Sequence, residues 1–356
     1  MNKQPWIGRP LTDIVFILLP PFLSLLVVIL FPSLFQDNKD MPEISWIILV
    51  LLVDVAHVYS TLYRTYFDPQ ALSGQRFLLW SIPFFGFIAG VLLYSMNSHL
   101  FWRLLAYIAV FHFVRQQYGF MRVYSRREPR KTIAAYIDII TVYYATLYPI
   151  VYWHLNGPTN FNWFIEGDFI YLQSKSVLLV ATILYFIVIG VYLFREIYSL
   201  VIKKYFNIPK FAIISGTLLS WYFGIVYFNG DMAFTLLNVV SHGVPYMALV
   251  WIYGDKNYNK KQKGSSFLRM VFSRYGVLLF LALVFLFAFV EEGLWDMFLW
   301  KEHSSVFGGR WLNADISKPL LSLLVPLLAL PQLTHYILDG FIWKIKQDDF
   351  KWSKEK

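Results

Sequence analysis

The chain has 356 residues, of which 58% are hydrophobic, 20% are aromatic and only 15% are charged. A water-soluble globular protein of this length does not have such a composition, so we expect lipid to surround most of the chain. The net charge of +9 does not indicate nucleic-acid binding, because the basic residues are spread between apolar segments. Since there is no cysteine, thiolate-bound metals, iron–sulfur clusters, disulfides and cysteine nucleophiles are excluded.

Apolar segments long enough to cross a hydrocarbon core of about 30 Å recur ten times. They predict an all-α, polytopic membrane helix bundle that forms a single transmembrane domain over residues 1–356. The first segment is too long for the apolar part of a signal peptide and lacks a small-residue cleavage site, so no cleavable signal peptide is expected. The predicted spans lie near residues 11–34, 44–65, 77–96, 98–120, 132–154, 175–198, 210–229, 232–253, 272–292 and 318–344.

The connections between these spans alternate between basic and acidic or neutral. Residues 115–131 and 256–274 are rich in Arg and Lys, for example, and 64–76 begins and ends with Arg, whereas 37–43 and 291–296 are acidic. This alternation follows the positive-inside rule and predicts both termini in the cytoplasm, as in a multi-pass protein of the bacterial inner membrane. Six of the 31 Lys and Arg residues would then lie outside, namely Lys39, Arg103, Lys175, Lys301, Arg310 and Lys318.

Four histidines fall inside even-numbered spans, and all of these spans run from the outside to the inside. These histidines are His57, His112, His242 and His335. Each lies about 8 to 11 residues from the inner end of its span, which is roughly 12 to 17 Å at a rise of 1.5 Å per residue. They are therefore expected in one layer. The other three histidines, His99, His154 and His303, fall at outer ends or in loops.

Polar residues accompany each of these histidines at spacings of three or four, which places them on the same helical face. They are Asp54, Thr61 and Arg64 around His57, Arg115 and Gln116 after His112, Asn238 before His242, and Gln332 and Asp339 around His335. Asp138 of the fifth span is expected at the same depth.

Four imidazoles and two carboxylates in a dry helix bundle predict a non-haem metal ion, with iron preferred and zinc as the alternative. The predicted ligands are His57, His112, His242, His335, Asp54 and Asp339. We expect Gln116, Asn238, Gln332, Arg64 and Asp138 to orient these ligands. Asp54, Asp339 and Arg115 are the predicted catalytic residues.

Other interpretations of the histidines stay open. Any one of them can be a core residue that hydrogen-bonds a neighbouring polar side chain. Two haems would need histidine pairs separated along the membrane normal, whereas these four share one depth. A proton- or ion-coupled transporter would use broken helices in two related halves. Pro20-Pro21, Pro245 and Pro331 are suited to breaking helices, but no second half of the chain resembles the first.

In ligand type and depth, the set resembles the histidine-rich integral-membrane desaturases and hydroxylases. Those families carry H-x3-H and H-x2-H-H boxes, which this chain lacks, so the likeness concerns chemistry alone. The chain also differs from the seven-helix zinc hydrolases that end in an H-x3-H helix, because His335 is followed at that spacing by Asp339.

The predicted function is iron-dependent oxygenation of a lipid or another hydrophobic small molecule. The alternatives are zinc-assisted hydrolysis, with Asp54 or Asp339 as the base, and proton- or ion-coupled transport. Expected partners are membrane lipids, the hydrophobic substrate and a cytoplasmic electron donor, which would meet the basic residues at the inner side.

Overall fold

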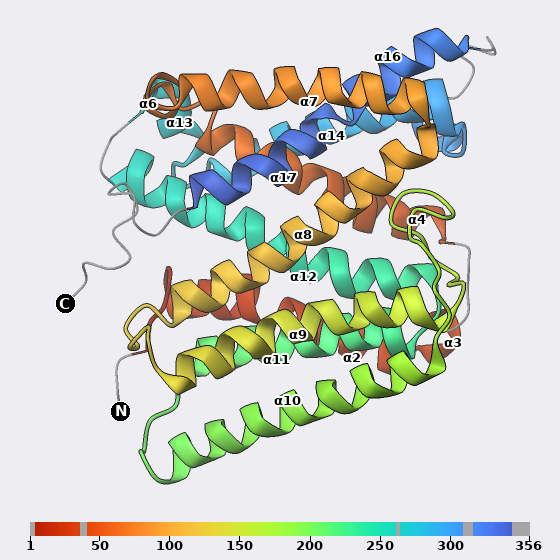
Figure 1. Cartoon of the computed structure of the whole chain (residues 1–356). Helices are drawn as coiled ribbons and strands as arrows, with labels where there is room; N and C mark the ends of the chain where they lie inside the picture. The colour runs from red at the N-terminus through yellow and green to blue at the C-terminus, as the bar shows by residue number, and fades with distance from the viewer. Residues whose placement is uncertain (1–3, 36–40, 261–263, 309–315, 344–356) are drawn as a thin grey trace. The chain divides into compact units, whose positions relative to one another are not determined.

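The computed structural model describes residues 4–35, 41–260, 264–308 and 316–343, and every regular element within these ranges is helical (Figure 1). Helices satisfy their backbone polar groups internally, as a segment surrounded by lipid must. Several begin where a polar side chain accepts a hydrogen bond from a backbone N–H of the first turn. These capping residues include Asp68, Thr132, Ser174, Asn207 and Ser265.

Eight helices in the described ranges are long and apolar enough to cross a membrane, or nine if a bent pair near the N-terminus forms one span. Each of the ten predicted spans is helical, but 98–120 is too polar to meet this criterion, although it is one continuous helix, α8 (Ser98–Tyr124). The charged and amide side chains within α8, such as Arg115 and Gln116, account for the difference. Lys39, Arg310 and the last residue of the tenth predicted span lie outside the described residues.

The helices divide into two compact units, of which the first comprises, among the described residues, 4–35, 41, 113–248 and 343. Its elements are α1 (Pro10–Asp13), η1 (Ile14–Leu18), α2 (Pro20–Leu30), α3 (Pro32–Phe35), α9 (Ile133–Asn156), α10 (Lys175–Val201), α11 (Ile208–Trp221), η4 (Tyr222–Tyr227) and the greater part of α12 (Asp231–Gly254). Helix α9 packs against both α10 and α11 (Figure 1). The first predicted span bends by 47° before Pro20-Pro21 because proline lacks the N–H that continues a helix.

The second unit comprises the described residues of 42–112, 249–260, 264–308 and 316–342. The continuous helices α8 and α12 therefore each contribute to both units. Its other elements are α4 (Glu43–Trp46), η2 (Ile47–Val55), α5 (Ala56–Ser60), η3 (Thr61–Arg64), α6 (Pro69–Gly74), α7 (Arg76–Met96), η5 (Asp255–Lys260), α13 (Ser266–Val271), α14 (Val277–Trp295), η6 (Asp296–Trp300), α15 (Ser304–Phe307), α16 (Lys318–Leu328) and α17 (Leu330–Ile342). The second predicted span is thus one helix that changes its winding, from α4 through the π-helical η2 to α5 and η3.

Two glycines let α7 lie close to α16 and α17 (Figure 1). A Cβ atom at Gly90 would lie 2.9 Å from Cβ of Pro326, and one at Gly86 would lie 3.0 Å from Cδ2 of Leu333. Small residues four positions apart are a common means of close helix approach in membranes, where van der Waals packing replaces the hydrophobic effect between helices. These contacts hold α17, which carries His335, beside α7.

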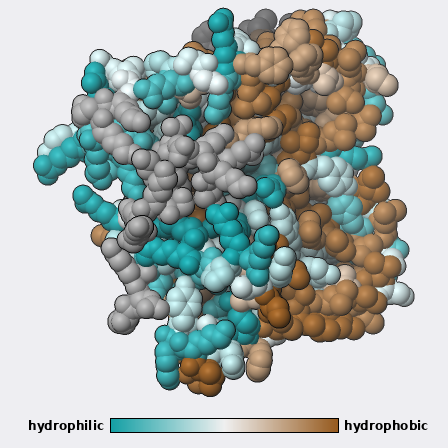
Figure 2. All heavy atoms as spheres, turned by 60° about the vertical axis from the view of Figure 1, so that its left-hand side comes forward, coloured by the Kyte–Doolittle hydropathy of each residue, from teal (hydrophilic) through white to brown (hydrophobic). Residues whose placement is uncertain are grey.

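The outward faces of α7 and α10 are apolar. Phe77 is 84% exposed and Phe194 is 73% exposed. Figure 2 shows hydrophilic side chains gathered on one face and hydrophobic side chains covering the flank beside it. Apolar surface of this extent is unusual for a soluble monomer and is compatible with a multi-pass membrane protein.

The acidic stretch at 291–296, predicted as an outer connection, is instead helical. Helix α14 continues to Trp295, and Glu291 and Glu292 are buried within it. Tyr59 Oη donates to Oε2 of Glu291 over 2.6 Å, and Trp295 Nε1 donates to Oε1 over 3.2 Å. These hydrogen bonds allow the carboxylate to lie inside the helix packing, which hydropathy alone does not reveal.

Candidate metal centre

Three of the four predicted histidines come together in the second unit, each from a different helix. His57 lies on α5, His112 on α8 and His335 on α17, and each is at most 2% exposed. The ring centroid of His335 lies 5.0 Å from that of His57 and 4.5 Å from that of His112. Each ring also offers a nitrogen within 4.8 Å of a nitrogen of the others. Because imidazole nitrogens bind zinc at about 2.0–2.1 Å, the three rings border a volume suited to one ion.

Each of these imidazoles has an oxygen atom near its Nδ1. Thr61 Oγ1 lies 2.7 Å from Nδ1 of His335, and the backbone carbonyl oxygen of Val53 lies 3.2 Å from Nδ1 of His57. Oδ2 of Asp339 lies 3.5 Å from Nδ1 of His112. In metal sites, an acceptor on one ring nitrogen fixes the tautomer and the orientation of the ring, and the other nitrogen binds the ion. The arrangement therefore suits all three histidines to bind a metal through Nε2.

The fourth histidine, His242, lies in the first unit on α12 and is fully buried. Its ring stacks on that of Phe113, with centroids 3.6 Å apart and planes 6° apart. Gln116 Nε2 donates to the backbone carbonyl oxygen of His242 over 2.9 Å. Phe113 is the residue that directly follows His112 in α8. Within the first unit, His242 therefore packs against α8 at Phe113, one residue after His112.

The two predicted carboxylates differ in their relation to the histidines. Asp339 has a side chain that is 10% exposed and approaches His112, as described above. The nearest carboxylate oxygen of Asp54 lies 3.8 Å from Nδ1 of His57, beyond an ordinary hydrogen bond, and this side chain is 38% exposed. Asp54 belongs to η2, whose π-helical turns change the angle between successive side chains. A spacing of three therefore does not align Asp54 with His57 as it would in a regular α-helix.

Three other predicted residues make their described contacts away from the imidazoles. Arg64 donates to the backbone carbonyl oxygen of Ile342 over 3.3 Å, at the end of α17. Gln332 Nε2 lies 3.5 Å from Oε1 of Glu291. Asn238 donates to the carbonyl oxygen one turn earlier in its own helix, over 2.9 Å. Arg64 and Gln332 thus link α17 to η3 and α14, which helps to place His335.

Arg115, predicted as catalytic, lies on an exposed face of α8. Its guanidinium donates to Tyr143 Oη over 2.8 Å and lies 5.0 Å from the ring centroid of Tyr118. These contacts join α8 to α9 within the first unit.

Asp138 belongs to a buried ion cluster of the first unit. It accepts hydrogen bonds from Arg195 and, over 3.0 Å, from Nζ of Lys210. Lys210 also lies 2.8 Å from Glu128, and Arg195 lies 2.7 Å from Glu196. The described partners of Asp138 thus join α9 to α10 and α11. The sequence analysis missed this cluster, and the signal that could have found it is the presence of charged Glu196 and Lys210 near the ends of apolar spans.

A cavity of about 340 Å³ adjoins the three histidines of the second unit. Its volume lies within the usual range for small-molecule sites, roughly 300–1,000 Å³. Most of its walls are apolar, and its polar side chains include Tyr59, Thr61, Thr334 and His335. A mainly hydrophobic cavity therefore adjoins the candidate metal centre.

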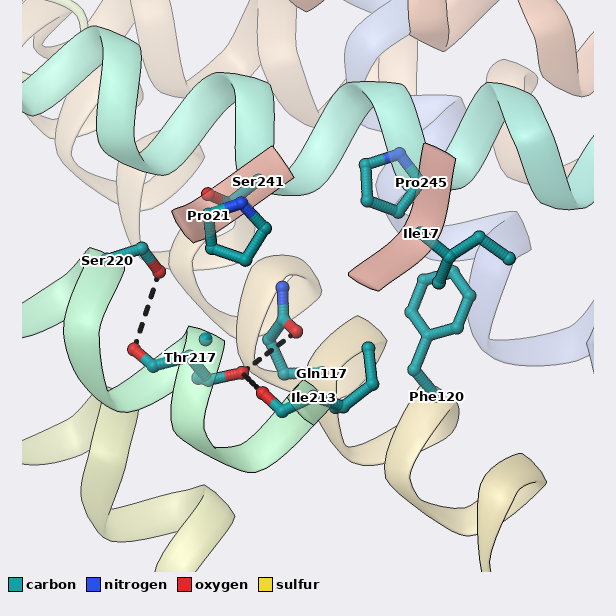
Figure 3. Close-up of a pocket in the computed structure, with 10 residues that line it drawn as sticks. Ile17, Pro21, Gln117, Phe120, Ile213, Thr217, Ser220, Ser241 and Pro245 are labelled. Atoms are coloured by element: carbon teal, nitrogen blue, oxygen red, sulfur yellow. Dashed lines mark hydrogen bonds between the residues drawn. The ribbon is translucent and has the colours of Figure 1, made fainter. Parts of the chain in front are cut away.

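A second, much smaller cavity lies in the first unit and is shown in Figure 3. It measures about 10 Å³, which is close to the space needed for a single water molecule. Its polar lining includes Gln117, Thr217, Ser220 and Ser241, and Thr217 Oγ1 lies 3.0 Å from Gln117 Oε1. This contact fixes α11 to α8 next to Gln116 and so helps to position His242.

No protein-family model, no curated protein and no solved structure matches this chain. The geometry of its own residues is therefore the basis for inferring its function.

Proposed function

We propose that this chain is a polytopic membrane enzyme that uses a non-haem metal ion, with iron preferred, to oxygenate a lipid or another hydrophobic small molecule. One observation carries the proposal. Three buried histidines border the same volume, and each has an oxygen atom near Nδ1, which suits the Nε2 atoms to bind an ion. A core histidine that only satisfies a neighbouring polar group would not need two further imidazoles with nitrogen atoms within 4.8 Å.

In this proposal, His57, His112 and His335 bind the metal together with His242. Two observations support the fourth ligand: its depth in the sequence matches the other three, and it lies against Phe113, the neighbour of His112. Asp339 orients His112, whereas the partly exposed Asp54 is placed to exchange protons with the centre. Neutral imidazoles suit iron, and also zinc, copper and nickel, without any thiolate.

The adjoining cavity favours oxygenation over hydrolysis. Hydrolysis of an ester or amide needs a base and hydrogen-bond donors aimed at a developing oxyanion. The walls of this cavity are mainly hydrocarbon instead. A bound iron would supply the activation of dioxygen. One oxygen atom would enter a C–H bond of the substrate, and the other would leave as water after receiving two electrons and two protons.

The electrons would come from a cytoplasmic donor protein. We place both termini in the cytoplasm and the protein in the bacterial inner membrane, on the charge pattern of its connections. The basic connection at 122–131 then offers a surface that complements an acidic donor.

Metal analysis of the purified chain tests this function. We expect stoichiometric iron, no haem absorbance, and turnover that requires both dioxygen and a reductant. Stoichiometric zinc with oxygen-independent product release would overturn oxygenation in favour of hydrolysis. A haem Soret band at one per chain, or a metal-free protein that drives solute uptake, would overturn the proposal as a whole.

Single alanine variants test the ligands. Substitution of His57, His112, His242 or His335 should lower bound metal and abolish turnover. His99, His154 and His303 provide the controls, because they lie at the outer ends or loops of the predicted spans, and their alanine variants should keep the metal. Metal content that survives at all four site variants, or that falls equally in the controls, would contradict the assignment.

A further inference from the structure

The apolar cavity beside His335 extends from an exposed surface to the candidate metal centre. At one end it is lined by Leu327 of α16, which is 52% exposed. At the other end it is lined by Val58, which is 5% exposed, and by His335, which is 1% exposed. Residues 318–342 are apolar and long enough to cross a membrane, so the exposed end would face lipid. A hydrophobic molecule in the bilayer would then reach the centre sideways, without passing through water.

The walls between these ends present hydrocarbon to a ligand. Leu62, Pro83 and Leu330 are among the residues that line the cavity. Its two tyrosines direct their hydroxyl groups to protein acceptors: Tyr66 donates to the carbonyl oxygen of Leu79 over 2.6 Å, and Tyr59 donates to Glu291 over 2.6 Å. Their rings therefore add apolar surface, and their hydrogen-bonding capacity is already used.

Thr334 is the exception on this wall. Its side chain is 8% exposed, and its Oγ1 atom is buried and has no hydrogen-bond partner among the described residues. A threonine in a helix can donate to the carbonyl group one turn earlier, as Thr141 does to Ile137 over 2.8 Å. A buried hydroxyl without such a bond is costly unless something else satisfies it. Thr334 thus holds an unsatisfied hydroxyl group within the cavity wall, next to the metal-site residue His335 in the sequence.

We propose that this cavity is the substrate site, and that the substrate is a molecule with a single hydrocarbon chain and one oxygen-bearing polar group. The chain enters past Leu327, and the Thr334 side chain rotates so that its hydroxyl group, enclosed in the wall without ligand, hydrogen-bonds the polar group of the substrate. The volume of about 340 Å³ is near the lower end of the range for ligand sites, which fits one chain rather than a two-chain phospholipid. This assignment rests on the proposed function, because the metal centre would make the position beside His335 reactive.

Photolabelling tests the site without requiring turnover. The probe is a hexadecanol analogue that carries a diazirine next to the hydroxyl group and an alkyne at the far end. The full-length protein in nanodiscs is irradiated, and labelled peptides are mapped by mass spectrometry. We expect labels on the segments around Thr61 and Thr334, and we expect excess hexadecanol to suppress them more strongly than hexadecane.

Two pairs of variants sharpen this test. Thr334→Val should weaken binding of the alcohol probe about three- to tenfold, the value of one hydrogen bond, whereas Thr141→Val should not. Leu327→Trp should obstruct the opening and reduce labelling. Leu323→Trp is its matched control, because Leu323 is 50% exposed on the same helix and does not line the cavity. Size-exclusion elution and thermal unfolding in detergent report whether each variant has folded.

The substrate assignment is overturned if labelling is unchanged in both Thr334→Val and Leu327→Trp, or if labels spread evenly over the lipid-exposed helix α10. Its failure is distinguishable from that of the proposed function. A chain that labels at Thr334 but contains no iron refutes the oxygenase and keeps the cavity as a lipid site. An iron-containing, oxygen-dependent enzyme that labels elsewhere refutes only the cavity.

Discussion

The contact between Thr61 and His335 provides the sharpest test of the metal centre. Thr61 Oγ1 lies 2.7 Å from Nδ1 of His335, and both residues are nearly fully buried. If His335 binds a metal through Nε2, its Nδ1–H donates to Thr61. Thr61→Val keeps the shape and volume of the side chain almost unchanged while removing the Oγ1 atom that receives this hydrogen bond.

Two general magnitudes indicate how much metal affinity Thr61→Val should lose. A buried hydrogen bond contributes roughly 0.5–1.5 kcal/mol on balance. Loss of a group that orients a metal-bound histidine typically weakens metal binding or activity by about 10- to 100-fold, or about 1.4 to 2.7 kcal/mol. We therefore expect Thr61→Val to raise the dissociation constant of the metal by at least about tenfold while the protein stays folded.

The assay is a competitive chelator titration of the purified protein, with bound metal measured by mass spectrometry. Thr65→Val is the matched control. Thr65 is also buried and lies one turn further along the chain, but its hydroxyl donates to the carbonyl oxygen of Thr61 over 2.8 Å. Equal metal affinity in Thr61→Val and the unaltered protein, or an equal loss in Thr65→Val, would refute the reasoning.

Two further predictions concern the helix packing. Gly90→Ala should destabilise the protein by about 1–3 kcal/mol, because the added Cβ would lie 2.9 Å from Cβ of Pro326. Gly190→Ala should be neutral or slightly stabilising, since no described atom outside its own helix backbone lies within 4 Å of the added Cβ. Unfolding in detergent measures both, and equal effects would contradict the close approach of α7 and α16. Asp138→Asn should cost about 3 kcal/mol because it leaves the buried Lys210 and Arg195 with one acceptor fewer, yet it should not change metal affinity. The control is Asp255→Asn, which removes a partly exposed ion pair with Lys260 and should lower the free energy of unfolding by no more than about 1 kcal/mol. A loss of metal in Asp138→Asn would instead place Asp138 at the metal centre.

The sequence by itself determined the helical class of the chain and the positions of its long helices. The reason is that a segment of about 20 apolar residues has few stable alternatives to a helix in lipid. The low tolerance of lipid for polar groups also singled out the histidines. An ionisable side chain inside such a segment is costly, so His57, His112, His242 and His335 stood out before any contact was known.

Only the tertiary structure shows which side-chain atoms lie close to the histidines. Helical periodicity predicts that Asp54 shares a face with His57, but the π-helical η2 alters that register and leaves Asp54 partly exposed. Asp339 and Thr61, from different helices, approach Nδ1 of His112 and His335. Such pairings depend on how helices tilt and rotate against one another, which the spacing within one helix does not specify.

The same limit explains why the sequence did not reveal the partners of buried charged residues. Glu291 falls where the ninth predicted span meets the acidic connection that follows it, and the structure shows that Tyr59 and Trp295 satisfy its carboxylate inside the second unit. Asp138 has its ion partners on α10 and α11. A sequence shows what each polar residue must satisfy, whereas only the packing of distant segments determines which partner satisfies it.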